Sequence, residues 1–208
     1  MCCCRPLTLA GKDREARELI RNNSEAIWRS GAKTLVTSCP ICYKIFSESY
    51  HLDVEILHHS QYINRLIQEK KLVLRFLNKS VVYHDPCELG RNSGVYSEPR
   101  EVLIHVARMQ KNPNSRENAL CCGGSLANIK IDRRDITTIA SDVYNELTST
   151  QPDYLATACP MCKKTFKKAE TGNSPEVIDI AEIVAMAITP TNVNVAESKK
   201  YRRSAVTV

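Results

Sequence analysis

Apolar and polar residues repeat along this chain with the spacing of helices in some stretches and of short strands in others. Apolar residues recur at helical spacing between residues 12 and 30, and Gly31 then supplies a helix stop. A second helical pattern covers residues 133–148. In the first stretch, the apolar face comprises Ala16, Leu19, Ile20 and Ile27.

Short apolar runs next to these helices predict strands. Residues 35–36 (LV) open a buried strand that leads to Cys39, and Leu155 opens an equivalent strand. Residues 81–83 (VVY) form another strand, which runs into Cys87. Strands that alternate with helices indicate an α/β fold with small parallel sheets and flanking helices, in which ligands gather at the carboxyl ends of strands. The cysteines stand at those ends.

The chain repeats itself once. Residues 34–42 (TLVTSCPIC) match residues 154–162 (YLATACPMC) at an offset of 120, and residues 54–63 correspond loosely to residues 176–184. This period is too long for a solenoid and indicates a duplicated half-domain. We expect an incomplete first half, a linker, a complete second half and a disordered basic tail, which occupy residues 1–66, 67–80, 81–188 and 189–208, respectively.

Composition is that of an ordinary globular protein. Of the 208 residues, 43% are hydrophobic, and the formal net charge is +6. Residues 189–208 hold four basic residues against one acidic residue, which accounts for +3 of the +6, so we expect a solvated terminus and no nucleic-acid partner. No apolar run approaches the roughly 18 residues of a membrane span, and no signal-peptide core follows Met1. These features predict a soluble, cytoplasmic protein with no membrane span.

Nine of the ten cysteines fall into two copies of one pattern, a vicinal Cys-Cys pair followed by Cys-Pro-x-Cys, with Cys87 as a fifth thiol in the second copy. Small secreted domains that use disulfides are shorter and carry a signal peptide. We therefore interpret these cysteines as metal-binding thiols in a reducing compartment. The first copy comprises Cys2, Cys3, Cys39 and Cys42, and the second comprises Cys87, Cys121, Cys122, Cys159 and Cys162.

The spacing of the thiols favours a site with several metal atoms. A Cys-x-x-Cys turn brings two thiolates together, but zinc knuckles, redox dithiols and iron–sulfur sites all use it. The side chains of a vicinal pair project apart, so the pair suits a multi-iron cluster better than one tetrahedral ion. Five thiols also exceed the four of an ordinary zinc or cubane centre. Gly123 and Gly124 would let the backbone approach the sulfur atoms and donate N–H groups to them.

Several other polar residues have two open interpretations each. His84 either orients the second site, by a hydrogen bond to a sulfur for example, or simply packs. His58 and His59 are expected to be core or surface histidines and not ligands. Arg91 and Arg100 either bind an anionic substrate or form salt bridges with neighbours, which could be Glu88, Glu98 or Glu101.

The second cysteine pattern and its flanking residues resemble the cysteine-rich CCG domain family. The matching segments are HDPCELGRNSGVYSEPREVL, NALCCGGS and ATACPMCKKTF, and the resemblance covers about residues 2–188. This family includes iron–sulfur subunits of heterodisulfide reductase and of glycolate, lactate and anaerobic glycerol-3-phosphate dehydrogenases. The sequence is most similar to the C-terminal part of a catalytic iron–sulfur subunit of heterodisulfide reductase.

The resemblance implies the iron–sulfur subunit of an oxidoreductase complex, in which an unusual [4Fe-4S] cluster serves electron transfer or disulfide reduction. Carried over residue by residue, the ligands at the second site are Cys87, Cys121, Cys122, Cys159 and Cys162. Those at the first site are Cys2, Cys3, Cys39 and Cys42, which would hold a second cluster or zinc.

Three features depart from the family pattern. Cys4 stands where the family has glycine, the first half lacks its leading strand and cysteine, and no ferredoxin-like Cys-x2-Cys-x2-Cys-x3-Cys-Pro segment is present. We therefore expect an N-terminally shortened member that receives electrons from a ferredoxin-type or flavin-bearing redox subunit, or that associates with itself through the uncovered sheet edge. The rival hypothesis is a non-enzymatic assembly or scaffold protein stabilised by zinc or a cluster.

Overall fold

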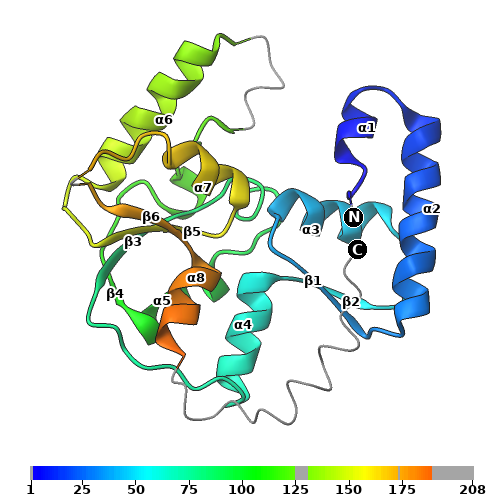
Figure 1. The fold of residues 1–208 in the computed structure, drawn as a ribbon, viewed down its shortest axis with the longest axis horizontal. Coiled ribbons are helices and arrows are strands. Elements are labelled where there is room, and N and C mark those ends of the chain that lie inside the picture. The colour runs from blue at the N-terminus through cyan, green and yellow to red at the C-terminus, as the bar shows by residue number, and fades with distance from the viewer. Residues whose placement is uncertain (1, 125–130, 173, 189–208) are drawn as a thin grey trace.

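The computed structural model describes residues 2–124, 131–172 and 174–188. Within these residues the chain forms two small parallel sheets flanked by helices, so the predicted α/β class is confirmed (Figure 1). The basic tail predicted over residues 189–208 lies outside the described residues.

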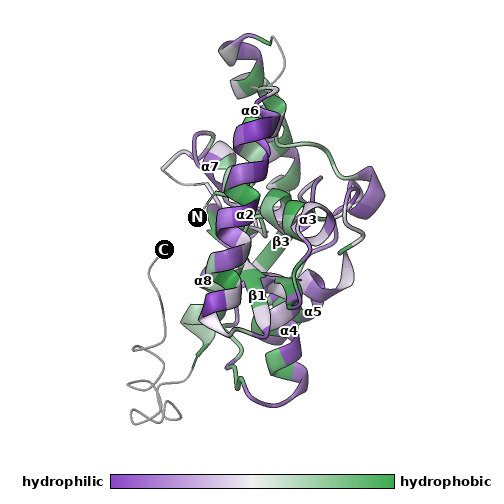
Figure 2. Ribbon diagram, turned by 90° about the vertical axis from the view of Figure 1, so that its right-hand side faces the viewer, coloured by the Kyte–Doolittle hydropathy of each residue, from purple (hydrophilic) through white to green (hydrophobic). Residues whose placement is uncertain are grey.

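The first half contains a two-stranded parallel sheet, in which Thr34 pairs with Glu55 and Thr37 with His58. Its longest helix, α2, ends at the predicted Gly31, whose left-handed backbone (φ 66°) caps the helix. Figure 2 shows polar and apolar residues alternating along this helix. The elements are α1 (Arg5–Leu9), α2 (Asp13–Ser30), β1 (Thr34–Thr37), α3 (Pro40–Ser49), β2 (Glu55–His58) and α4 (His59–Gln68).

The second half contains a four-stranded parallel sheet with the order β4-β3-β5-β6. One core lies on each of its faces, because alternate residues of β3 point to opposite sides: Val81 and Tyr83 to one core, Val82 to the other. The elements are β3 (Ser80–His84), α5 (Ser97–Val106), β4 (Arg108–Met109), the 3-10 helix η1 (Arg116–Asn118), α6 (Arg133–Leu147), β5 (Tyr154–Thr157), α7 (Pro160–Phe166), β6 (Glu176–Asp179) and α8 (Ile180–Ala187).

The predicted repeat is visible in the structure, because β1-α3-β2-α4 follows the same plan as β5-α7-β6-α8. Cys39 and Cys159 are the N-cap residues of α3 and α7, and the proline after each occupies the first helical position. His58 and Asp179 both close capping boxes, at the start of α4 and α8. The Cys-Pro-x-Cys segments, expected from the sequence to be turns, are thus the first turns of helices.

The two sheets differ at one edge. Strand β5 pairs with β3 on one side and β6 on the other, whereas β1 pairs only with β2 among the described residues. The side chain of Val36 is 39% exposed as a result. The expectation of a buried strand at residues 35–36 was therefore wrong for this residue, because no further strand covers β1 in the described parts.

The predicted linker lies against the second half. Leu72, Leu74 and Leu77 pack on the core beneath α5 and α8, and the Arg75 N–H donates to the Ala187 carbonyl at 2.9 Å. Helix α5 packs against both α8 and α4, so it joins the two halves (Figure 1).

Candidate metal centre

Five thiols of the second half meet where strands β3 and β5 end. Cys87 follows β3, Cys159 caps α7 after β5, and Cys162 lies in the first turn of α7. Adjacent thiols are in hydrogen-bond contact in the order Cys87, Cys121, Cys122, Cys162 and Cys159, and the Sγ atoms of Cys122 and Cys162 are 3.2 Å apart. The structure therefore brings together all five thiols that the sequence assigned to this site.

These contacts separate the protonation states of neighbouring thiols. Hydrogen bonds from Cys122 and Cys87 lower the pKa of Cys121 to about 2. Cys122 and Cys87 each form a hydrogen bond to Cys121. This bond is the main reason that the pKa of Cys122 rises to about 12, and it is also the main reason that the pKa of Cys87 rises. The site favours a thiolate at Cys121, and the thiolate is the form of cysteine that binds metals.

The five thiols form a line of contacts and not a ring around one point. In residues 2–124, 131–172 and 174–188, no group of three or more Cys, His, Asp or Glu side chains is arranged to hold a metal ion. A structural zinc site needs four ligands around one centre. The arrangement suits a cofactor with several metal atoms better than a single ion.

The backbone after the vicinal pair lies close to the sulfur atoms. The Gly123 N–H donates to Cys121 Sγ and the Gly124 N–H donates to Cys122 Sγ, both at 3.4 Å. Gly123 has a φ of 80°, and a Cβ on Gly124 would lie 2.6 Å from Thr165 Oγ1. The first position thus needs glycine for its backbone angle and the second for space. N–H groups directed at sulfur stabilise an anionic thiolate cofactor, so these residues fit an iron–sulfur cluster.

His84 supports the second site through the backbone. Its Nε2 lies 3.0 Å from the carbonyl oxygen of Leu120, the residue before Cys121, and its Nδ1 lies 3.4 Å from Thr157 Oγ1. The ring packs edge-on against Phe166, and burial lowers its pKa. Of the two interpretations from the sequence, the orienting role fits, although the ring contacts a carbonyl and not a sulfur.

A buried ion pair, which sequence patterns did not reveal, holds the same loop from its other side. Arg100 donates to both carboxylate oxygens of Asp85 at 2.7 and 2.6 Å, and the Arg116 N–H donates to Asp85 Oδ2 at 2.9 Å. Arg91 donates to the Ala119 carbonyl at 2.6 Å. The neighbouring glutamates suggested as partners for these arginines were therefore wrong. Asp85 stands in the segment HDPC, but no local pattern signals a partner 15 positions away.

The first site gathers three thiols. Cys42 forms hydrogen bonds with both Cys3 and Cys39, and these bonds lower the pKa of each of those two thiols to about 6. Cys2, the fourth thiol expected here, is exposed. This half therefore presents a smaller and more open group than the second half.

Cys4 takes the backbone conformation of the corresponding glycine. Cys4 has a φ of 72° and Gly123 a φ of 80°, and each directly follows its vicinal pair. A left-handed backbone is uncommon for residues other than glycine. Cys4 is 2% exposed, and burial raises its pKa. The alignment of Cys4 with the family's glycine therefore agrees with the backbone.

The two Cys-Pro-x-Cys segments approach each other at the junction of the halves. His58 is fully buried there, with its Nε2 3.3 Å from the Ser38 carbonyl and a further hydrogen bond to the Ala158 backbone. Ser38 and Ala158 directly precede Cys39 and Cys159, and these two thiols are close enough to interact electrostatically. Burial lowers the pKa of His58 to about 3, so a neutral ring links the two sites.

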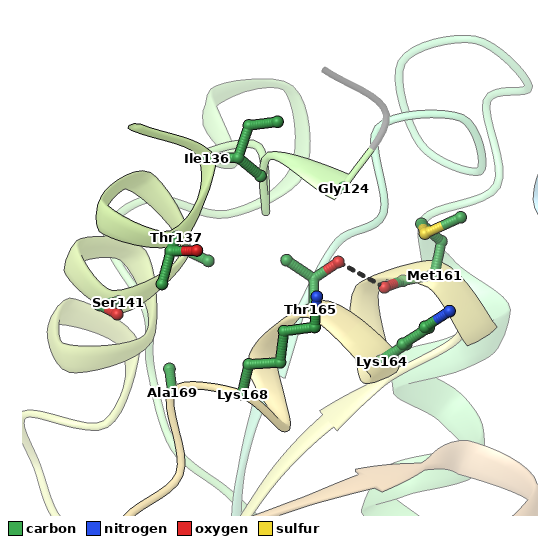
Figure 3. Close-up of a pocket in the computed structure, with 10 residues that line it drawn as sticks. Gly124, Ile136, Thr137, Ser141, Met161, Lys164, Thr165, Lys168 and Ala169 are labelled. Atoms are coloured by element: carbon green, nitrogen blue, oxygen red, sulfur yellow. Dashed lines mark hydrogen bonds between the residues drawn. The ribbon is translucent and has the colours of Figure 1, made fainter. Parts of the chain in front are cut away.

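A cavity of about 360 Å³ opens beside the second site, between α6 and α7 (Figure 3). Gly124, Met161 and Thr165 line its inner end, where the Thr165 hydroxyl donates to the Met161 carbonyl at 2.8 Å. Ile136 faces them from α6 (Figure 3). The backbone that donates to Cys122 Sγ therefore also forms a wall of an open cavity.

Comparison with known families identifies the fold and site together. The family model described as "CCG: Cysteine-rich domain" matches residues 1–47 and 81–167. The chain therefore belongs to the CCG cysteine-rich domain family. The matched segments contain all nine cysteines of the two patterns.

Among curated proteins, the chain is similar to iron–sulfur oxidoreductases. It is 32% identical over 202 residues to a subunit of the dihydromethanophenazine:CoB–CoM heterodisulfide reductase of Methanosarcina barkeri, and the match covers 90% of this chain and 49% of that protein. It is 24% identical to the probable iron-sulfur-binding oxidoreductase FadF of Bacillus subtilis (88% and 27% covered) and 27% identical to the EtfAB:quinone oxidoreductase of Syntrophomonas wolfei (90% and 28% covered). The chain spans about half the length of the heterodisulfide reductase subunits it matches. In the described parts of the chain, every helix is too short or too polar to cross a membrane.

Proposed function

We propose that this chain is the iron–sulfur module of an oxidoreductase complex similar to heterodisulfide reductase, and that it transfers electrons for the reduction of a substrate disulfide. The observation that carries this proposal is the continuous contact of five thiols at the ends of β3 and β5. Membership of the CCG family and the names of the similar proteins point to the same class of reaction.

In this proposal the ligands of a [4Fe-4S] cluster at the second site are Cys87, Cys121, Cys122, Cys159 and Cys162. Such a cluster, when bound, supplies one-electron transfer. The N–H groups of Gly123 and Gly124 offset negative charge on the sulfur atoms. His84 and the Asp85–Arg100 pair keep the loop that carries the vicinal pair in place.

The first site would hold a second cluster or zinc, with Cys2, Cys3, Cys39 and Cys42 as its ligands. Cys3, Cys39 and Cys42 are already in contact, so binding requires Cys2 to turn inward and these three thiols to close around the bound group. Because Cys39 and Cys159 interact across the junction, groups bound at the two sites would be neighbours. The proposed halves are residues 1–66 and 81–188, joined by residues 67–80.

Reduction of a disulfide breaks one S–S bond, consumes two electrons and two protons, and releases two thiols. We propose that the electrons come from a ferredoxin-type or flavin-bearing subunit, since the similar proteins include named subunits of larger enzymes. The ten free cysteines suit a reducing compartment, which supports a cytoplasmic location for the reaction.

Metal analysis of anaerobically purified protein tests this proposal. We expect a brown protein with about four irons and four acid-labile sulfides per chain from the second site alone, and about eight of each if the first site also holds a cluster. Electron paramagnetic resonance and disulfide-dependent oxidation of a reduced ferredoxin-type donor provide independent readouts. Stoichiometric zinc without sulfide, in protein made under iron-replete anaerobic conditions, would contradict the proposal and favour the scaffold hypothesis.

A further inference from the structure

Helix α7 presents two lysines to solvent directly beside the second thiol site. Met161, Lys164 and Lys168 are spaced three and four residues apart, so they lie along one side of α7 and of the turn that extends it. Figure 3 shows them in this order, across the cavity from Ile136 of α6. Met161 is 43% exposed, and both lysines are exposed as well. We call these three residues the α7 ridge.

The α7 ridge carries positive charge that nothing nearby balances. The two other lysines of this segment form ion pairs, Lys163 with Glu182 and Lys167 with Glu170. In the described parts of the chain, neither lysine of the ridge forms an ion pair, and none of the residues that line the adjacent cavity is acidic. Two exposed ammonium groups without counter-charges attract an acidic surface.

The equivalent helix of the first half lacks this feature. The 120-residue repeat aligns the α7 ridge with Ile41, Lys44 and Glu48 of α3. Glu48 forms an ion pair with Lys44, whose ammonium also donates to the Asn92 carbonyl of the second half at 3.1 Å. The position equivalent to Lys168 is thus acidic in α3, and the one lysine is already paired. Of these two helices, the one beside the five thiols therefore carries the free double positive charge.

The α7 ridge also borders the second site. Met161 stands between Cys159 and Cys162 in the Cys-Pro-x-Cys segment, and both of these thiols are buried. Met161 and Gly124 line the same cavity, and the Gly124 N–H donates to Cys122 Sγ. A protein that contacts the ridge therefore comes within one residue of Cys162, while the thiols themselves stay covered.

We infer that the α7 ridge is the docking surface for an acidic electron-carrier protein of the ferredoxin type. This inference rests on the proposed function, which supplies the redox role of the partner. Carboxylates of the partner would pair with Lys164 and Lys168, and Met161, whose flexible side chain adapts to different surfaces, would add an apolar contact. Redox complexes are typically small and transient, and charge complementarity steers and orients them. Two charges are too few for strong nucleic-acid binding, which gains its affinity from many phosphate contacts.

Binding of an oxidised, acidic two-cluster ferredoxin to the anaerobically purified protein tests this inference, because an oxidised carrier binds without turnover. By calorimetric titration at low salt we expect a Kd of about 1–100 μM. The Kd should rise at least about tenfold between about 0.05 M and about 0.5 M NaCl. The variant Lys164→Glu/Lys168→Glu should weaken binding at low salt by at least about tenfold, whereas Lys164→Arg/Lys168→Arg should bind within about twofold of the unchanged protein.

A matched variant separates the position of these charges from their number. Lys12→Glu/Lys33→Glu reverses two exposed lysines of the first half and changes the net charge by the same amount. This variant should bind the ferredoxin within about threefold of the unchanged protein. A basic cytochrome c and duplex DNA are the comparison ligands, and both should bind at least about tenfold more weakly than the ferredoxin. All variants should contain the same amount of iron, because the ridge supplies no thiol.

Four results would overturn the inference. The first is no measurable ferredoxin binding by protein that contains iron. The second is an equal loss of affinity in the two charge-reversal variants, which would mean that only net charge matters. The third is tighter binding of cytochrome c or DNA than of the ferredoxin, and the fourth is loss of iron from Lys164→Glu/Lys168→Glu, which would place these lysines in the metal site. Iron content tests the proposed function separately, so protein that holds iron but fails to bind the ferredoxin contradicts only the docking surface.

Discussion

The two halves of the molecule share one plan but differ at the outer edge of their sheets. In the described residues β1 is the edge strand of the first sheet, whereas the second sheet continues beyond the equivalent strand β5 through β3 to β4. Strand β3 ends at His84 and leads into Asp85 and Cys87, and these three residues supply one thiol and two supports for the loop before Cys121. The second site accordingly gathers five thiols and the first gathers three. The shared β-α-β-α unit thus places a Cys-Pro-x-Cys helix start by itself, while a complete site needs the neighbouring strand.

The largest difference should appear when Cys122 is replaced with serine. Cys122 contacts both Cys121 and Cys162, so its loss divides the line of thiols in two. We expect iron and sulfide to fall from about four to below about one per chain, with loss of the electron paramagnetic resonance signal. Cys2→Ser is the matched control at the exposed position of the first half and should keep about four irons at the second site. Equal losses in the two variants would show that the sites do not differ as described.

Asp85→Asn should be the next most damaging change. Asp85 is 3% and Arg100 14% exposed as side chains, so the variant leaves a nearly buried guanidinium without its counter-charge. We expect the free energy of unfolding, measured by chemical denaturation, to fall by about 3 kcal/mol. The control is Glu25→Gln in the first half, where an exposed pair with Arg29 should contribute less than about 0.5 kcal/mol. Similar small losses in both variants would contradict a supporting role for Asp85.

Gly124→Ala tests the close approach of the backbone to the second site. The new methyl group would lie 2.6 Å from Thr165 Oγ1 and 2.8 Å from Met161 Cγ, so we expect a loss of about 1–3 kcal/mol and a lower iron content. Gly172→Ala is the control, because no atom of the described residues beyond its chain neighbours lies within 4 Å of its added Cβ. If Gly124→Ala bound iron normally with unchanged stability, the segment would have room that the structure does not show.

The smallest effects should come from the paired positions Cys4 and Gly123. Gly123→Ala forces a side chain into a left-handed backbone and should cost about 1–2 kcal/mol. Cys4→Gly relieves the same strain but removes a buried side chain, so the net change should stay within about 1 kcal/mol. Denaturation and metal content measure both. Loss of first-site metal in Cys4→Gly would show that Cys4 is itself a ligand.

Local signals predicted much of the fold. Helical periodicity and Gly31 placed α2 to within a residue, and the 120-residue repeat identified the matching units from the sequence alone. His58 and His59 are both buried, as the core interpretation expected. These features depend on residues that are close in the sequence. Periodicity and helix-stop signals are patterns among such residues, so they predict these features directly.

Contacts between distant residues could not be predicted in the same way. The pair of Asp85 with Arg100 and the contact of His84 with the Leu120 carbonyl depend on how β3, α5 and the loop before Cys121 pack together. Sequence patterns also indicated that the thiols belong to two sets, but not that Cys2 is exposed while Cys3 is buried. The burial of adjacent thiols depends on which elements cover them, and those elements are far apart in the sequence.

The packing of residues 69–79 has a consequence for how the molecule unfolds and how it responds to cleavage of the chain. Leucines of this segment are part of the core beneath α5 and α8, and α5 also rests on α4. The segment is therefore not a flexible tether, and cleavage within it should yield two fragments that remain associated. In calorimetry the two halves should melt in one transition, and amide exchange in α4, α5 and α8 should slow or quicken together when either half is perturbed.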